Sequence, residues 1–358
     1  MTSFVLEAAS VIAGQPTVPL MEHLPLGAVE RLALEAGLLT RRDPVGNLVV
    51  GQGTELVLVA HLDHPGFAID SVGAGLISLD FRGGVRAGVA VPGTPVLLHR
   101  PGVSDPVGRA VLATVDESDG RLSAAGAELV EGEAPAGGFA VWDVTSYQLA
   151  DGRITARACD DLLGVAAGLA ALAKAGATRA SLVCTRAEEL GWFGALEAVR
   201  LGTIPRQATV LSLECSPMLA HAPQGGGVIV RVGDRRSIFC PEVTDALWSR
   251  ARDLGVVAQR RLMDGGSCEA TVFCAQGLRS SGLALSLAGY HNQPDDLSCS
   301  GPTAESVLVA DLEAEADLLI SLCEDPPGPA DAEWLESVSA QATAALAAAP
   351  LTGPGLPT

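Results

Sequence analysis

Two kinds of hydrophobic pattern alternate along much of the chain. Residues 56–60 (LVLVA) and 180–185 (ASLVCT) are almost continuously apolar, which is typical of strands covered on both faces. Residues 4–13, 26–38 and 160–176 instead carry small and apolar side chains at helical spacing. Because strands and helices alternate, the pattern predicts a three-layer α/β/α domain.

The same alternation continues toward the C-terminus. Residues 207–216 and a segment within 279–289 are composed like strands, whereas residues 192–202, 242–255 and 305–324 have helical spacing. These segments extend the predicted α/β domain to about residue 325.

Helical periodicity is nearly absent between residues 70 and 149. Short alternating segments (LISLDF, TPVLLHR, RAVLATV) are separated there by Gly, Pro, Asp and Ser, which predicts a small β-barrel-like domain. It is an insertion, because the α/β pattern returns after it. The predicted organisation is a catalytic domain in two parts, 1–69 and 150–325, the inserted β-domain 70–149, and a linker and C-terminal tail 326–358.

Charge narrows the range of partners. The 358 residues have a net charge of −19, and Lys174 is the single lysine. This charge argues against nucleic acids and anionic membranes as partners, since phosphate binding needs clustered basic residues. The N-terminus lacks a basic segment, and no run approaches the ~18 apolar residues of a membrane span. We therefore expect a cytoplasmic protein.

Polar residues with metal-binding chemistry follow the predicted strands or open the helix of residues 160–176. In open α/β sheets, ligands bind at the carboxyl ends of the strands. Two imidazoles and three or more carboxylates are the ligand set for two borderline cations such as Zn²⁺, which also supply the positive charge that so many carboxylates need. The residues are His61, Asp63, Asp160, Asp161, Glu188, Glu189, Glu214 and His291.

Each of these residues has an ordinary structural explanation when taken alone. Asp160 would serve as a helix N-cap, and adjacent Glu188 and Glu189 would suit the first turn of a helix. A histidine after a strand is usually a surface or core residue. Their occurrence together at one predicted sheet edge favours a metal site.

The ordered motifs AHLDHPGF, ARACDDLLG, TRAEELGWFGA, LSLECS and SLAGYHNQPDD resemble the tetrahedral, or glutamyl (deblocking), aminopeptidases, a family of dinuclear zinc metallopeptidases. The resemblance spans about residues 5–322. It implies a zinc-exopeptidase-like catalytic domain, removal of N-terminal residues from short peptides, and a homo-oligomer built through the inserted β-domain.

The resemblance also implies residue roles. Glu188 is the general base for a metal-bridging water, and Asp63 supports the first histidine. From the spacing alone, Glu188 and Glu189 could exchange roles. Two divalent ions, Zn²⁺ or alternatively Co²⁺ or Mn²⁺, are bound by His61, Asp160, Glu189, Glu214 and His291, with Asp160 bridging both.

The sequence departs from the family pattern at two places. Glu214 stands where the family usually has Asp, and the family's GGTDA appears here as GGSCEA, with Cys268 in the Asp position. Glu at the first position also occurs in related dinuclear carboxypeptidases and deacylases. An N-acyl amino acid deacylase or carboxypeptidase on the same dinuclear site is therefore an alternative.

That alternative calls for an arginine near the site that recognises a carboxylate; Arg86, Arg157, Arg186 and Arg279 are the candidates. A binding or assembly module with a decayed site is a third hypothesis. The intact ligand set and Glu188 argue against decay.

Overall fold

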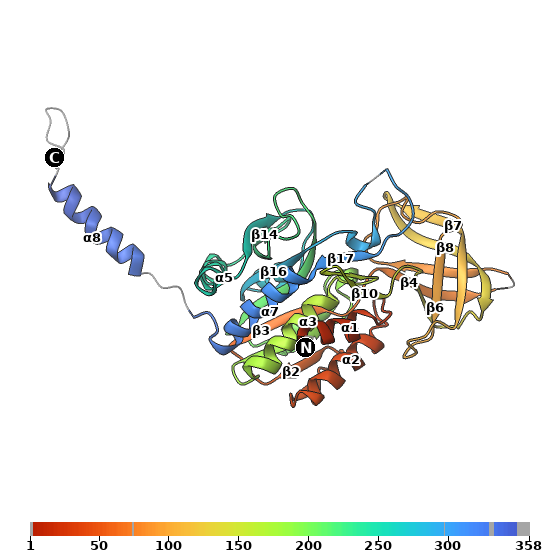
Figure 1. The fold of residues 1–358 in the computed structure, drawn as a ribbon, viewed down its shortest axis with the longest axis horizontal. Coiled ribbons are helices and arrows are strands. Elements are labelled where there is room, and N and C mark those ends of the chain that lie inside the picture. The colour runs from red at the N-terminus through yellow and green to blue at the C-terminus, as the bar shows by residue number, and fades with distance from the viewer. Residues whose placement is uncertain (1–2, 74, 297, 329–332, 349–358) are drawn as a thin grey trace. The chain divides into compact units, whose positions relative to one another are not determined.

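The computed structural model describes residues 3–73, 75–296, 298–328 and 333–348 (Figure 1). It comprises two compact units, Met1–Pro327 and Gly328–Thr358. The second unit holds a single described helix, α8 (Glu333–Ala348). The sheets, the barrel and the remaining helices belong to the first unit.

An eight-stranded mixed sheet forms the centre of the first unit. Its four middle strands, β12, β3, β13 and β16, are parallel neighbours. The strands in spatial order are β1 (Thr40–Arg42), β2 (Leu48–Gly51), β12 (Ala180–Thr185), β3 (Leu56–His61), β13 (Thr209–Pro217), β16 (Arg279–Leu287), β14 (Val228–Asp234) and β15 (Ala258–Met263).

Helices cover both faces of this sheet. Along β3, Leu56, Leu58 and Ala60 pack into the core on one face, while Val57 and Val59 pack into the core on the other. The continuous apolar run reflects this double burial. The predicted three-layer fold is confirmed. The first face is covered by α1 (Phe4–Ala13), α2 (His23–Glu35), α3 (Leu162–Ala175), α5 (Pro241–Leu254) and α7 (Val309–Glu324), and the second by α4 (Phe193–Arg200) and α6 (Glu269–Ala275).

The predicted inserted barrel is also confirmed. Six strands close around an apolar centre in which Phe67 packs edge to face against Phe81 and Trp142, at 5.0 Å between ring centroids in each pair. The first strand starts five residues after His61, so the barrel adjoins the sheet (Figure 1). The strands in closing order are β4 (Gly66–Val72), β5 (Ile77–Arg82), β8 (Arg121–Gly132), β7 (Gly108–Ser118), β6 (Pro95–His99) and β9 (Phe139–Trp142). The domain boundaries themselves stay a prediction.

Some predicted elements differ from the structure. The helix expected over residues 305–324 begins only at Val309, because Glu305–Leu308 forms strand β17. β17 pairs with β11 (Arg153–Ala156), which pairs with β10 (Tyr147–Ala150). Strands β14 and β15 and helix α6 were not predicted. Among the described residues, no helix is long and apolar enough to cross a membrane.

Candidate metal centre

Strand register brings the predicted ligands to one edge of the sheet. Thr185, the last residue of β12, is level with His61, the last residue of β3. Ser212 of β13 is level with Val59 of β3, so Glu214, two residues further, is level with His61. The parallel register thus places side chains that are more than a hundred residues apart in the sequence at the same level along the sheet.

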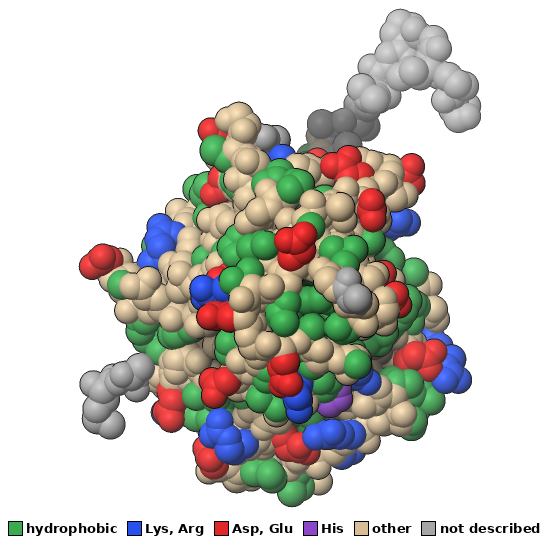
Figure 2. Space-filling model, turned by 90° about the vertical axis from the view of Figure 1, so that its right-hand side faces the viewer, with side chains coloured by type: hydrophobic (Ala, Val, Ile, Leu, Met, Phe, Trp, Pro, Cys, Tyr) green, Lys and Arg blue, Asp and Glu red, His purple; other side chains and the backbone are tan. Residues whose placement is uncertain are grey.

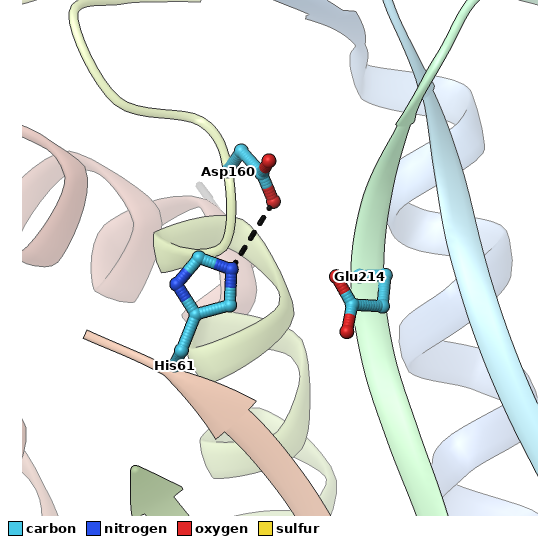
Figure 3. A group of neighbouring side chains, drawn as sticks. All are labelled: His61, Asp160 and Glu214. Carbon is cyan, nitrogen blue, oxygen red and sulfur yellow. Dashed lines mark ion pairs between the residues drawn. The ribbon is translucent and has the colours of Figure 1, made fainter. Parts of the chain in front are cut away.

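The first group of facing side chains is His61, Asp160 and Glu214, whose ligand atoms lie within 4.8 Å of one another. Figure 3 shows them pointing toward one another from the end of β3, the loop before α3, and β13. His61 Nε2 lies 3.5 Å from Asp160 Oδ1. Ser212 Oγ donates a 3.0 Å hydrogen bond to Glu214 Oε1. All three side chains are buried.

The second group is Asp160, Glu189 and His291. His291 Nε2 lies 3.4 Å from Asp160 Oδ2 and 2.9 Å from Glu189 Oε1. Asp160 therefore presents one oxygen to each group. All five predicted ligands are brought together, and their roles at a metal remain a proposal.

The two groups fit divalent metal ions. Ligands about 2.0–2.2 Å from a tetrahedral Zn²⁺ lie roughly 3.3–3.6 Å from one another, close to the separations of Asp160 from the two histidines. Glu189 Oε1 is buried and accepts no hydrogen bond, although His291 Nε2 is near it. Both atoms belong to a group of ligand atoms that lie within 4.8 Å of one another, as ligands around one ion do.

Burial and charge perturb these groups strongly. Burial disfavours protonation of His61, but Asp160, Glu188 and Asp63 outweigh it and raise its pKa well above the usual range. His291 responds in the same way to Glu189 and Asp160. For Asp160, burial is outweighed by the two histidines, which lower its pKa. The carboxylates thus favour positive charge on the histidines that face them, and a bound cation would supply the same compensation.

For Glu188 and Glu214, nearby positive charge does not outweigh the effect of burial on the pKa. Burial, with Glu189 and Glu214 nearby, raises the pKa of Glu188 well above its usual range. Burial raises the pKa of Glu214 to about 7, against the opposing effects of His61 and Arg231. Glu188 lines the same cavity as the two ligand groups. Its position beside both ligand groups is that of a carboxyl able to exchange protons with a molecule bound in the cavity.

A strained turn aims the adjacent glutamates. Glu188–Leu190 forms a short 3₁₀ turn, and Ala187 (φ 53°) and Trp192 (φ 62°) beside it are left-handed. Such backbone persists only when its surroundings hold it. Asp63, buried two residues after β3, accepts hydrogen bonds from the backbone N–H groups of Glu188 (2.9 Å) and Glu189 (3.0 Å).

The structure refines the predicted relation between Asp63 and His61. The Asp63 backbone carbonyl lies 3.0 Å from His61 Nδ1, whereas its carboxylate oxygen is 3.9 Å away. The carboxylate chiefly positions the turn of the two glutamates, and the carbonyl orients the imidazole.

Two further buried carboxylates hold the loops and were missed by sequence reasoning. Glu305 accepts hydrogen bonds from the backbone N–H groups of Cys159 (2.7 Å), Asp160 (3.0 Å) and His291 (2.8 Å). Glu22 accepts from the N–H of Ala187 (3.1 Å). Neither residue lies next to a motif, so no local signal marks them.

His64 lies near the ligand groups, but both of its ring nitrogens have hydrogen-bond partners. Its Nδ1 lies 2.9 Å from the Asp160 carbonyl and its Nε2 2.9 Å from Asn292 Oδ1. Both ring nitrogens are thus used in bracing the two ligand-bearing loops, which leaves none for a metal.

The four arginines suggested for carboxylate recognition do not line the cavity. Arg157 donates to the Trp142 carbonyl, Arg186 pairs with Glu22, and Arg86 donates to the Cys299 carbonyl. Arg279 donates to Thr209 Oγ1 at the opposite end of β13 from Glu214. The arginines that do line the cavity are Arg121, Arg235 and Arg236, which sequence reasoning did not single out.

Comparisons with known proteins show which proteins the chain is similar to. Residues 124–297 match the sequence model of the family described as M42 glutamyl aminopeptidase. A search of curated proteins found no match. Among solved structures, the chain is similar to an aminopeptidase from the archaeon Desulfurococcus kamchatkensis, with 20% identity, a TM-score of 0.75, and 94% of this chain and 97% of that chain covered.

Two other solved structures share the fold. The TET1 peptidase of Pyrococcus horikoshii has 18% identity and a TM-score of 0.74 over 90% of this chain and 99% of that chain. A TET aminopeptidase from a marine sediment Thaumarchaeota archaeon has 15% identity and a TM-score of 0.74 over 93% and 98%.

The match to the M42 glutamyl aminopeptidase model, with the fold shared with the similar aminopeptidases, confirms the resemblance to the tetrahedral or glutamyl aminopeptidases, a class of metal-dependent exopeptidases. The protein is a metal-dependent aminopeptidase, a hydrolase of peptide bonds.

Proposed function

We propose that the protein removes N-terminal residues from short peptides at a centre of two divalent ions, with Zn²⁺ the expected metal and Co²⁺ or Mn²⁺ alternatives. The observation that carries this proposal is the Asp160 carboxylate, which presents Oδ1 to His61 and Oδ2 to His291. One ion would be held by His61, Asp160 and Glu214, and the other by Asp160, Glu189 and His291. Such ions supply Lewis-acid chemistry that acidifies water and polarises a carbonyl.

Glu188 is the proposed general base and acid. Its side chain lines the cavity beside both groups, and its neighbour Glu189 is committed to the His291 group. From this position its carboxylate would take a proton from the attacking water and return it to the leaving amine. The two adjacent glutamates thus have separate tasks.

The substrate's amino terminus is cationic, and the buried end of the cavity is rich in carboxylates. A free ammonium or amine is therefore favoured there over a blocked terminus. An N-acyl substrate lacks this basic amine and would offer the inner groups only an uncharged amide.

We also propose a homo-oligomer that acts in the cytoplasm. The similar TET1 peptidase can assemble into a tetrahedron or a large octahedral shell. In this chain, Figure 2 shows apolar areas among the charged side chains on the face it presents, and the barrel exposes Val72, Leu76, Leu129 and Val130. Light scattering tests this, and a monomeric mass would refute it.

A substrate panel tests the proposed activity. Metal-loaded protein is assayed with aminoacyl-anilides, short peptides and N-acyl amino acids, beside a Glu188→Gln variant. We expect cleavage of the free-amine substrates alone, reduced by about a thousandfold in the variant. Full activity of Glu188→Gln would refute the general-base role, and cleavage of only N-acyl substrates would refute the aminopeptidase assignment.

A further inference from the structure

The active-site cavity has two ends of opposite charge. Its volume is about 260 Å³. We call the buried groups of His61, Asp160, Glu189, Glu214 and His291, together with Glu188, the inner end. The outer end consists of three exposed arginines, Arg121, Arg235 and Arg236.

These arginines have no ion-pair partner among the described residues, although the chain carries an excess of acidic groups. Their guanidinium groups are free to meet a ligand. Arg121 comes from the first position of β8 in the barrel, and Arg235 and Arg236 follow β14 in the sheet domain. Two separate parts of the fold therefore bring positive charge to the same opening.

The local structure holds the outer arginines near the inner end. Arg121 Nη1 lies over Gly84, where an added Cβ would come within 2.9 Å, and the Gly84 carbonyl is 3.0 Å from His291 Nδ1. The Arg236 guanidinium carbon lies 5.7 Å from the ring centroid of Trp192, close to the glutamate turn. Cation–π contact fixes such a side chain without neutralising its charge.

The loop that bears two of them is also anchored. The Arg235 N–H donates to the Gly266 carbonyl (2.9 Å), and the Arg236 N–H donates to Asp234 Oδ1 (2.8 Å). Asp234 Oδ2 accepts from the Cys268 N–H (3.0 Å). The arginine loop is thereby tied to the GGSCEA segment, which lines the same cavity.

We infer that the outer end binds a carboxylate of the substrate, located beyond the scissile bond. This rests on the proposed aminopeptidase function. A short peptide carries an ammonium at one end and a carboxylate at the other, and the cavity presents carboxylates at its inner end and guanidiniums at its outer end. The carboxylate can be the peptide's own C-terminus or the side chain of an Asp or Glu; guanidinium groups pair well with either.

The test compares matched peptides on the metal-loaded protein. Leu-Gly-Gly is compared with Leu-Gly-Gly-amide for the terminal carboxylate, and Leu-Gly-Asp-amide with Leu-Gly-Asn-amide for the side chain. We expect the acid of at least one pair to have a kcat/KM about tenfold above its neutral partner, falling as ionic strength rises. The pair that shows the preference identifies the source of the carboxylate.

Variants assign the preference to the arginines. In Arg235→Gln/Arg236→Gln the ratio should fall to within about twofold of unity, and Arg235→Glu/Arg236→Glu should favour the neutral peptide. The matched control, Arg31→Gln/Arg252→Gln, removes the same charge from exposed positions on α2 and α5 and should keep the wild-type ratio. A ratio near unity for both wild-type pairs, or one unchanged in the arginine variants, overturns the inference.

A binding measurement separates this inference from the proposed function. Calorimetry with the same peptides and Glu188→Gln protein gives the ratio of affinities for acid and neutral forms without any turnover. An acid preference in binding with no cleavage by the wild type would refute the peptidase activity and retain the carboxylate site. Cleavage by the wild type without any acid preference in binding would support the peptidase activity and refute the carboxylate site.

Discussion

The inner and outer ends of the cavity are built in opposite ways. At the inner end, buried carboxylates and imidazoles are held by strand register and by hydrogen bonds from backbone N–H groups to Asp63 and Glu305. At the outer end, exposed arginines project from a loop and a barrel strand without ion-pair partners among the described residues. Chemistry requires fixed geometry, whereas recognition of a distant charge tolerates mobile side chains. We therefore expect mutations to have large effects at the inner end and modest ones at the outer end.

The largest effect should come from Asp160, the residue shared by both ligand groups. Asp160→Asn replaces an anionic oxygen by an NH₂ group that cannot ligate a cation. We expect kcat/KM to fall by about a thousandfold or more and metal content, measured by atomic emission, to drop. Asp317→Asn, at an exposed position of α7, is the control. Wild-type metal content and activity in Asp160→Asn would contradict the bridging role.

A buried carboxyl without partners gives the next largest effect. Glu315 of α7 is fully buried, neither oxygen has a hydrogen-bond partner, and burial raises its pKa from 4.5 to about 8. The native state keeps this proton up to about pH 8, whereas the unfolded chain releases it near 4.5. The native state binds more protons between these values, so stability should fall as pH rises through that window, by on the order of 3 kcal/mol at pH 7.

Chemical denaturation between pH 5 and 8 measures this dependence. Glu315→Gln removes this titrating group and should make the free energy of unfolding less dependent on pH. Glu313→Gln, exposed on the same helix, should leave that dependence unchanged. If the free energy of unfolding depends on pH equally in Glu315→Gln and wild type, Glu315 does not titrate in this window. Uncompensated burial would then cost less at Glu315 than at the inner end.

Asp63 tests whether the support of the inner end matters as much as its ligands. Asp63→Asn places an amide NH₂ against a backbone N–H of the glutamate turn. We expect a 10- to 100-fold loss in kcat/KM, the range typical for partners that orient metal ligands. The control is Asp43→Asn, a buried aspartate that accepts from the N–H groups of Val45 and Asn47 away from the cavity. It should lower the unfolding temperature and spare the kcat/KM of the folded protein.

The smallest effect belongs to the outer end. Arg121→Gln alone should reduce the acid-to-neutral ratio of the favoured peptide pair by about threefold, since two arginines remain and exposed charge pairs are individually weak. Steady-state kinetics at low ionic strength measures it, with Arg109→Gln on the neighbouring strand β7 as the control. A hundredfold loss of kcat/KM for both peptides of the pair would instead show that Arg121 is needed for catalysis at the inner end.

Sequence reasoning was strongest where function follows local pattern. His61, Glu188, Glu189, Glu214 and His291 could be singled out because each follows a recognisable apolar strand, and in the structure all five line one cavity. The arginines and Glu305 were missed for a common reason. Arg235 sits in a polar loop after a strand that was not predicted. Glu305 lies in a strand that depends on pairing with residues 153–156, about 150 positions away.

The sequence by itself determined the layers of the fold and the residue types at the strand ends, because hydrophobic periodicity depends only on neighbouring positions. The tertiary structure decided which strand ends are level, how the glutamate turn is aimed, and which arginines share the cavity with the metal groups. These properties arise from pairings between distant segments: β3 with β12 and β13, Asp63 with the turn after β12, and the barrel with the loop of His291. Nonlocal contacts of this kind leave little trace in local pattern, since either partner alone is an ordinary polar residue.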